Sequence, residues 1–230
     1  MKRIDIHDPA AFDQAVDAIH ADAIVVQLPS VFVLLAAPTT QGAAQLDRSK
    51  TRLAGKNYGT AIGSLPAFLA QADASQLPAE FSTAADFERM TGTFIRLRFR
   101  SRDFQSATLR DGSHQGVLLD GVHRALFKRI EASFADAPPD AIWGGFNYAA
   151  PLCTSCNVSG DPDGSIVDLD RALDFARQRG VGLVVTGADS TEQRGSYPIF
   201  GYERQRVALH REGPGLDHFK RQIPAQLRGW

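Results

Sequence analysis

The feature that most limits the fold of this chain is an alternation of helix-like and strand-like segments along most of its length. Apolar residues recur at helical spacing over 12–19, which predicts a helix that Asp8 caps and Pro9 begins. The apolar run 23–29 then predicts a buried strand, and the run 31–36 continues it or forms the next one. This alternation predicts an α/β domain around one sheet.

The rest of the chain continues the pattern. Residues 38–57 are polar and predict an irregular segment, and Ser165 is a candidate helix cap. Further strands are predicted at 59–65, 93–100, 115–121, 181–187 and within 203–215, and helices at 66–72, 86–90, 122–134 and 165–179. Because the connections are irregular, we expect a single domain with a twisted mixed sheet flanked by helices. We expect this domain to span 1–215 and a basic tail to span 216–230.

Composition restricts the function and the location. Of 230 residues, 43% are hydrophobic and 22% are charged, which is typical of a folded globular protein. The net charge of −1 gives no overall basic signal for nucleic acid, although a local basic surface remains possible. No apolar run approaches the roughly 18 residues that cross a bilayer, and the N-terminus lacks the apolar core of a signal peptide. We therefore expect a cytoplasmic protein with no membrane partner.

The segment LCTSCNVSGDP (152–162) has three interpretations. Cys153 and Cys156 form a C-x-x-C pair, which occurs in redox dithiols and in zinc sites. The chain has only these two cysteines, and its histidines show no paired spacing that would complete a zinc site. A redox pair should open a helix, whereas turn-forming residues follow here. The third interpretation is a polar loop that holds phosphate, in which the cysteines are simply small residues.

Three separated polar clusters could together hold an anion. They contain Lys50, Arg52 and Lys56 in the first, Ser155 and Asn157 in the second, and Ser196 and Arg211 in the third. Lysine and arginine side chains bind carboxylate and phosphate, and hydroxyl groups and loop amides bind phosphate oxygens. The sequence contains no nucleophile elbow, no Walker motif and no dinucleotide-binding glycine pattern, which leaves hydrolase, P-loop and Rossmann functions without support.

The order of these clusters resembles the YrdC-like family of threonylcarbamoyl-adenylate synthases. KTRLAGK matches the family pattern K-x-R-x-x-x-K, and TSCNVSGDP resembles its T-S-A-N-x-S-G-x-P loop with Cys156 in place of alanine. Ser196 stands at a family serine, and Arg211 stands at the arginine of a closing R-x-G element. The resemblance covers residues 9–215 and favours the phosphate loop over the dithiol.

The resemblance implies a YrdC-like fold with a concave basic face, and it implies a reaction. Such enzymes join threonine, bicarbonate and ATP into threonylcarbamoyl-AMP, which feeds the modification of an adenosine in tRNA. By this resemblance Lys50 and Arg52 are catalytic and hold the carboxylate, carbamate or phosphate. Lys56, Ser155, Asn157, Ser196 and Arg211 bind the nucleotide or the intermediate, and Mg²⁺ accompanies ATP without a dedicated protein site.

Two departures from the family pattern and one arginine-rich strand keep the substrate open. Phe32 replaces a family threonine, which predicts a more apolar substrate pocket, and Leu118 stands where the family has an arginine. The product is therefore threonylcarbamoyl-AMP or a related carbamoyl-adenylate. Arg96, Arg98 and Arg100 lie on one face of the strand 93–100 and suggest an alternative, a non-catalytic module that binds tRNA, double-stranded RNA or a nucleotide.

Overall fold

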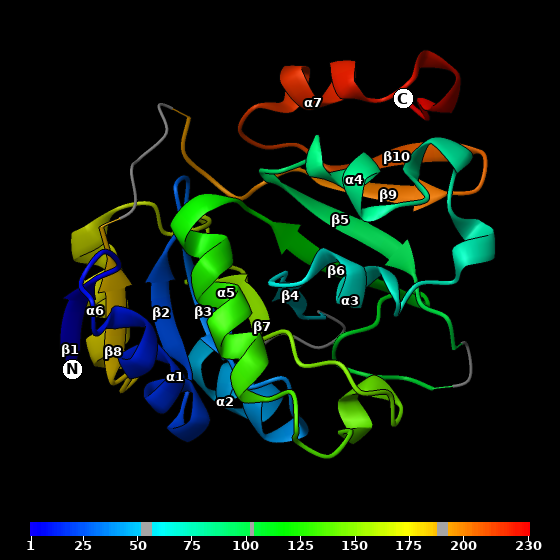
Figure 1. Cartoon of the computed structure of the whole chain (residues 1–230). Helices are drawn as coiled ribbons and strands as arrows, with labels where there is room; N and C mark the ends of the chain where they lie inside the picture. Colours follow the sequence, from blue (N-terminus) through cyan, green and yellow to red (C-terminus); the bar gives the residue numbers. More distant parts are fainter. Residues whose placement is uncertain (52–56, 102–103, 188–192) are drawn as a thin grey trace.

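The structure is a computed structural model that describes residues 1–51, 57–101, 104–187 and 193–230 (Figure 1). Its strands are β1 (Lys2–Asp5), β2 (Ile24–Gln27), β3 (Phe32–Ala36), β4 (Gly59–Ala61), β5 (Thr93–Arg98), β6 (Ser113–Leu118), β7 (Leu152–Ser155), β8 (Leu183–Thr186), β9 (Ile199–Glu203) and β10 (Arg206–Arg211). Its α-helices are α1 (Ala11–Ala21), α2 (Thr40–Lys50), α3 (Leu65–Leu69), α4 (Ala84–Glu88), α5 (Gly121–Ser133), α6 (Leu169–Gln178) and α7 (Leu216–Gln222).

The ten strands of the described residues form one sheet in the order β1-β8-β2-β3-β7-β4-β6-β5-β9-β10. Four neighbouring pairs are parallel (β1 with β8, β2 with β8, β4 with β6, and β5 with β9), and the other five are antiparallel. The predicted single α/β domain with a mixed sheet is therefore confirmed. None of the helices in the described segments has the length and apolar character needed to cross a membrane.

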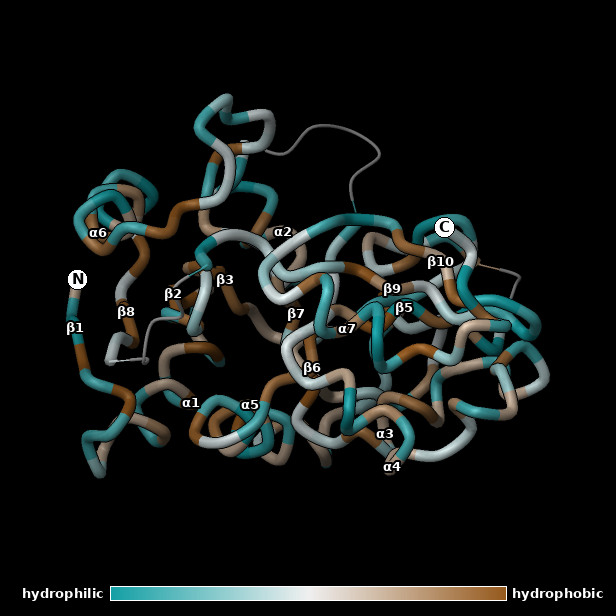
Figure 2. Tube along the Cα trace, turned by 90° about the horizontal axis from the view of Figure 1, so that it is seen from above, coloured by the Kyte–Doolittle hydropathy of each residue, from teal (hydrophilic) through white to brown (hydrophobic). Residues whose placement is uncertain are grey.

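Side chains alternate between two apolar cores, one on each face of the sheet. Val33 and Leu35 of β3 pack in one core with α1 and α5, which lie side by side in Figure 2. Leu34 of the same strand packs in the other core with residues of α2, α3, α4, α6 and α7. The strands in the middle of the sheet are buried on both faces, which explains why their sequences read as continuous apolar runs.

One segment that the sequence predicted to be irregular contains a helix. Helix α2 occupies residues 40–50, and the Thr39 side chain caps it by accepting a hydrogen bond from the Gly42 backbone N–H at 3.0 Å. Its buried face carries polar residues, among them Gln45 and Lys50, together with only a few apolar ones. A search for apolar periodicity therefore could not detect it.

Two helix starts differ from the prediction. Helix α1 begins at Ala11, and Asp8 instead closes the turn before it by accepting a hydrogen bond from the Ala10 backbone N–H. Helix α6 is capped by Asp168, which accepts from the Arg171 backbone N–H, whereas Ser165 lies outside the helix. The predicted helices themselves are confirmed.

Segment 152–162 begins as a strand and continues as a loop. Residues 152–155 form β7, which pairs with β3 on one side and β4 on the other. The loop that follows therefore leaves from the middle of the sheet, beside the C-terminus of α2. At the end of the chain, Phe219, Ile223 and Leu227 are buried in the same core as α2 and α6. The division into a domain 1–215 and a tail 216–230 stays a prediction.

A candidate anion-binding cleft

A cleft of about 610 Å³ lies at the point where the loop after β7 meets the strands β5, β6, β9 and β10. Its described lining carries four Lys and Arg side chains and one histidine, against a single carboxylate, Asp111. The basic lining residues are Lys50, Arg96, Arg110, His210 and Arg211. The same lining contains the predicted residues Ser155 and Asn157. Such a lining suits an anionic ligand.

Lys50 and the loop after β7 form one wall, which we call the lysine corner: Lys50, Ser155 and Asn157. The Lys50 Nζ atom donates to the Ser155 carbonyl oxygen at 2.5 Å, to the Asn157 carbonyl oxygen at 2.7 Å and to Asn157 Oδ1 at 3.2 Å. In return, the Ser159 backbone N–H donates to the Lys50 carbonyl oxygen at 3.0 Å. Because the Lys50 side chain is 3% exposed and these oxygens are uncharged, the ammonium holds the loop in place and keeps a positive charge beside it.

The corner leaves one donor group of Asn157 available for a ligand. Asn157 Oδ1 accepts from Lys50 Nζ and also from the Ser155 hydroxyl, the latter at 2.6 Å. Within the described residues the Nδ2 group of Asn157 makes no hydrogen bond. The corner therefore presents amide N–H donors next to a fixed positive charge, which is an arrangement that binds phosphate or carboxylate oxygens.

Arg211 lines the same cleft as this corner. Its Nε and Nη2 atoms donate to the Tyr197 carbonyl oxygen at 3.0 and 2.7 Å, and its guanidinium lies 5.5 Å from the centre of the Phe94 ring. Burial, together with the nearby Arg96, lowers the pKa of Arg211 to about 10, so the side chain is still charged at neutral pH. The structure thus brings Lys50, Ser155, Asn157 and Arg211 to one cleft.

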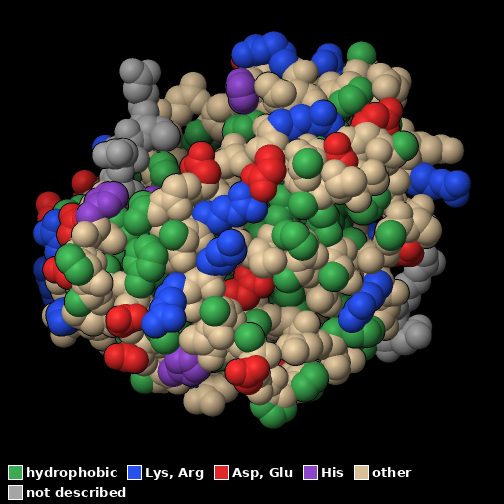
Figure 3. All heavy atoms as spheres, viewed as in Figure 1, with side chains coloured by type: hydrophobic (Ala, Val, Ile, Leu, Met, Phe, Trp, Pro, Cys, Tyr) green, Lys and Arg blue, Asp and Glu red, His purple; other side chains and the backbone are tan. Residues whose placement is uncertain are grey.

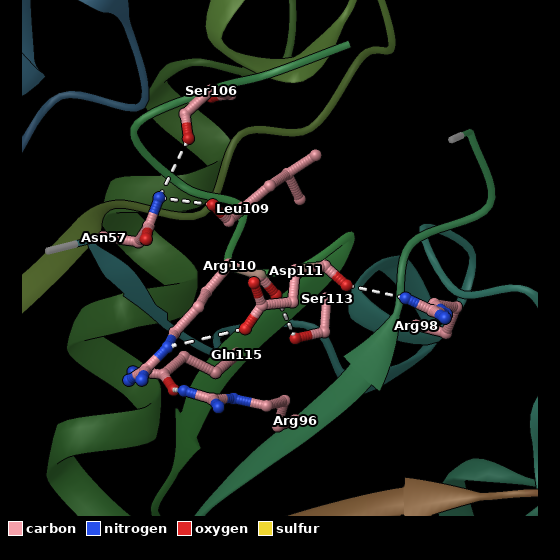
Figure 4. A network of polar contacts seen from close by, with 9 residues as sticks. All are labelled: Asn57, Arg96, Arg98, Ser106, Leu109, Arg110, Asp111, Ser113 and Gln115. Carbon is pink, nitrogen blue, oxygen red and sulfur yellow. Dashed lines mark hydrogen bonds and ion pairs between the residues drawn. The ribbon is translucent and has the colours of Figure 1, made fainter. Parts of the chain in front are cut away.

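A second group of basic residues lines the cleft, which we call the arginine wall: Arg96, Arg110 and His210. Sequence reasoning had singled out Arg96 on the strand 93–100 but missed Arg110 and His210. Arg96 lies opposite Gln115 in the β5–β6 pair, and its Nη2 and Nε atoms donate to Gln115 Oε1 at 2.5 and 3.2 Å (Figure 4). On its other side Arg96 pairs with Gly201 of β9. A Cβ atom at Gly201 would lie 2.2 Å from His210 Nε2, so the glycine makes room for the histidine beside Arg96.

A tight turn before β6 positions Arg110. Arg110 and Ser113 exchange two backbone hydrogen bonds of 2.9 Å around Asp111 and Gly112, which have φ angles of 51° and 70°. Two successive positive φ angles are typical of a type I′ turn, and Asp-Gly is a sequence signal for it. This dipeptide could have located the turn from the sequence. Figure 4 shows the Arg110 side chain reaching back over Gln115 toward Arg96.

The remaining predicted site residues lie elsewhere or outside the described residues. Arg52 and Lys56 belong to the segment 52–56, which the structure does not describe. Ser196 lines a separate open groove with Ser165, and their hydroxyl oxygens are 2.6 Å apart. The described lining of the cleft does not include Ser196. Its assignment to the nucleotide therefore stays a prediction.

The arginines of the strand 93–100 take different partners. Arg96 binds Gln115, whereas Arg98 donates to the Asp111 carbonyl oxygen at 2.6 Å. Arg100 follows the strand, and its guanidinium lies 3.8 Å above the centre of the Phe146 ring. On the face seen in Figure 3, Lys and Arg side chains are interspersed with Asp and Glu. The concave basic face and the RNA-binding alternative stay predictions.

The two departures from the family pattern lie in the core and not in the cleft. Phe32 is 2% exposed and packs in the core that contains α2, and Leu118 is fully buried at the end of β6. The expectation that Phe32 makes the substrate pocket more apolar is therefore wrong. In this protein Arg96, on the strand beside β6, places a guanidinium in the cleft.

The two cysteines are buried on opposite faces of the sheet. Cys153 packs in the core of α1 and α5, and Cys156 packs in the core of α2 and α6. Both thiols are free, and burial raises the pKa of each to about 12. Such thiols stay protonated at neutral pH, which argues against redox and metal-binding roles. Among the residues that the structure describes, no group of three or more His, Cys, Asp or Glu side chains could hold a metal ion.

Comparison with known proteins identifies the fold. No protein-family profile and no curated protein sequence matches the chain. Among solved structures, a double variant of Sua5 from P. abyssi has a TM-score of 0.72 and 16% identity, and the match covers 99% of this chain and 65% of Sua5. P. abyssi Sua5 in complex with L-threonine has a TM-score of 0.70, with 16% identity and coverage of 99% of this chain and 60% of Sua5.

Two further proteins share the fold. E. coli YciO has a TM-score of 0.62 and 14% identity, and the match covers 92% of this chain and 93% of YciO. A full-length HypF in its phosphate- and nucleotide-bound form has a TM-score of 0.62 and 14% identity, with coverage of 86% of this chain and 28% of HypF. The chain has the fold of Sua5 and YciO, and the resemblance inferred from the sequence is thereby confirmed at the level of the fold.

Proposed function

We propose that this protein is a YrdC-like enzyme that uses ATP and bicarbonate to convert an amino acid into a carbamoyl-adenylate. The observation that supports it best is that the lysine corner and Arg211 line one cleft, in a fold shared with Sua5. Ligands of two proteins with this fold also support it, since Sua5 has been solved with L-threonine and HypF with phosphate and a nucleotide. The sequence order of the corner residues matches the family pattern independently.

The proposed reaction needs no protein nucleophile. The amine nitrogen attacks the carbon of bicarbonate, and loss of water leaves a carbamate. A carbamate oxygen then attacks the α-phosphorus of ATP, a new P–O bond forms, and pyrophosphate leaves with the electrons of the broken P–O bond. The protein must hold two anions against each other and stabilise the additional charge of the transition state.

Each described residue has a role in this proposal. Asn157 Nδ2 donates to a phosphate or carbamate oxygen, while Lys50 keeps the loop and its positive charge in place. Arg211, held by the Tyr197 carbonyl, neutralises charge in the same cleft. Mg²⁺ arrives on the phosphates of ATP, since Asp111 is the one carboxylate in the described lining and cannot by itself form a cage. A role in tRNA modification follows if the amine is threonine.

The test is release of pyrophosphate from ATP with Mg²⁺ and bicarbonate, measured with threonine, with each other amino acid in turn and with none. We expect amine-dependent release, and we expect Asn157→Asp to reduce kcat/KM at least tenfold because a carboxylate would replace the amide donors. Arg129→Gln is the matched control, because Arg129 pairs with Asp13 on the outside of α5. If no amine stimulates release, the enzymatic proposal is rejected. Salt-sensitive binding of tRNA without turnover would favour the RNA-binding alternative.

A further inference from the structure

The arginine wall is a cluster of like charges whose protein partners are mostly neutral. Arg96 hydrogen bonds to the amide of Gln115, and no carboxylate contacts Arg96 within the described residues. Arg110 approaches Asp111 at 3.8 Å, but the two side chains are 63% and 92% exposed, so the pair is weak. Charges gathered in this way repel one another until an anion binds between them.

Mutual repulsion in the wall is also evident from ionisation. Burial, and after it the positive charge of Arg110, lower the pKa of Arg96. Burial, and after it the charge of Arg96, lower the pKa of His210. Burial, and after it the positive charge of Arg96, also lower the pKa of Arg211. An arrangement of this kind is costly for a surface without a ligand, and it is typical of binding sites.

The wall lies where the cleft continues away from the lysine corner. A second cavity of about 420 Å³ shares Arg96, Asp111, Ser113 and His210 with the main cleft. Its lining adds Arg98 and Glu203, and Glu203 pairs with Arg206 at 2.7 Å. The second cavity therefore combines cations with two carboxylates. These acids would repel a polyphosphate. An amino acid with one additional carboxylate has negative groups that can pair with the cations and an ammonium group that can pair with the acids.

We propose that Arg96, Arg110 and His210 form a second anion subsite that selects an amine substrate with an additional carboxylate, as in glutamate or aspartate. This inference rests on the proposed function, and it names the class of amine that the reaction accepts. The guanidinium groups of Arg96 and Arg110 bind the side-chain carboxylate, and Asp111 faces the ammonium group. The lysine corner remains available for the nucleotide.

The test compares ligands that differ only in the charge of the side chain. Isothermal calorimetry measures the binding of glutamate and glutamine, each with and without a non-hydrolysable ATP analogue and Mg²⁺. We expect glutamate to bind about tenfold or more tightly than glutamine, because hydrogen bonds to charged groups contribute more than those to neutral ones. Arg96→Gln and Arg110→Gln should each reduce this preference to about twofold or less, and the Arg129→Gln control should retain it.

Three outcomes would overturn the inference. Glutamate and glutamine could bind equally or not at all, or the preference for glutamate could persist in both arginine variants. Alternatively, Arg96→Gln could abolish a preference for ATP over AMP while the two amino acids bind alike, which would assign the wall to phosphate groups. Circular dichroism of each variant checks that the fold is retained.

Failure of the subsite and failure of the enzymatic proposal give different results. If glutamate binding is charge-selective but no amine releases pyrophosphate, the subsite stands and the reaction does not. If threonine supports turnover and glutamate shows no selective binding, the reaction stands and the subsite does not. Asn157→Asp, which alters only the lysine corner, should leave the preference for glutamate unchanged in the absence of nucleotide.

Discussion

The two walls of the cleft hold positive charge in different ways. In the lysine corner, one buried ammonium is bound by three oxygens of a single loop, and its positive charge stabilises that loop. In the arginine wall, three basic groups lie on separate elements. Burial and a neighbouring arginine lower the pKa of Arg96 and of His210. The first arrangement holds the loop of the site in place, whereas the charges of the second are available to bind a ligand. The difference suggests that the corner serves the common part of the chemistry and the wall serves specificity.

The largest expected effect comes from removing the charge of the corner. Lys50→Met leaves the oxygens of Ser155 and Asn157 without their buried donor, so we expect a loss of about 2–4 kcal/mol in the free energy of unfolding. Binding of AMP should weaken at least about 100-fold if the variant folds. Urea denaturation and calorimetry measure the two effects, with Arg129→Gln as control. A stable Lys50→Met protein with unchanged AMP binding would remove the distinction between the walls.

Acid should destabilise the protein through His114 of β6, the strand that pairs with the Arg96 strand. His114 of β6 is buried between Phe68, Trp143 and Tyr148, its Nε2 atom lies 3.2 Å from the Thr60 hydroxyl, and burial lowers its pKa to about 3. Because the unfolded histidine takes up a proton at about pH 6.5 and the folded one does not, the folded state is fully favoured above that pH and loses stability as the pH falls toward 3.

The expected loss is up to about 1.4 kcal/mol per pH unit in this window. His114→Phe keeps an aromatic ring in the cluster and should flatten the dependence by this amount. Chemical denaturation at intervals between pH 7 and pH 4 measures this slope in the wild-type protein and in the variant. Both proteins have the same carboxylates, so the difference between the slopes reports on His114. Identical slopes for the two proteins would show that His114 does not titrate in this way.

A smaller change should disturb the wall and spare the corner. Gly201→Ala places a methyl group on the position of His210 Nε2, so the histidine must move. We expect a loss of about 1–2 kcal/mol in stability and a reduced preference for glutamate, with AMP binding unchanged. Gly182→Ala is the matched control, because a Cβ atom at Gly182 meets nothing within 4 Å. Equal weakening of AMP and glutamate binding would mean that the two walls act as one site.

The smallest effect is expected outside the cleft. Ser196→Ala removes a hydrogen bond with Ser165 and should cost about 0.5–1 kcal/mol in stability. Because Ser196 lines the separate groove, AMP affinity should change by less than about twofold. A tenfold loss measured by calorimetry would show that the groove and the cleft hold the same ligand, as the resemblance implies for Ser196.

Much of the fold could be predicted from the chain, and the misses have physical causes. The predicted strands 23–29, 93–100 and 181–187 are confirmed because their apolar patterns are long and regular. Helix α2 was missed because its buried face is largely polar, and β7 was missed because turn-forming residues follow it directly. Within the site, Lys50, Ser155, Asn157 and Arg211 were found through their resemblance to a family pattern. Arg110 and His210 were missed because no family pattern contains them.

The sequence by itself determined the alternation of elements, the two apolar faces of each central strand and the identity of the loop that approaches Lys50. Local periodicity and turn chemistry are enough for these features, because they depend on neighbours along the chain. Only the tertiary structure decided that Arg96, Gly201 and His210 stand side by side, that Arg110 turns back over them, and that Ser196 lies apart. These relations depend on strand order and register, which join residues more than a hundred positions apart and leave no periodic mark in the sequence.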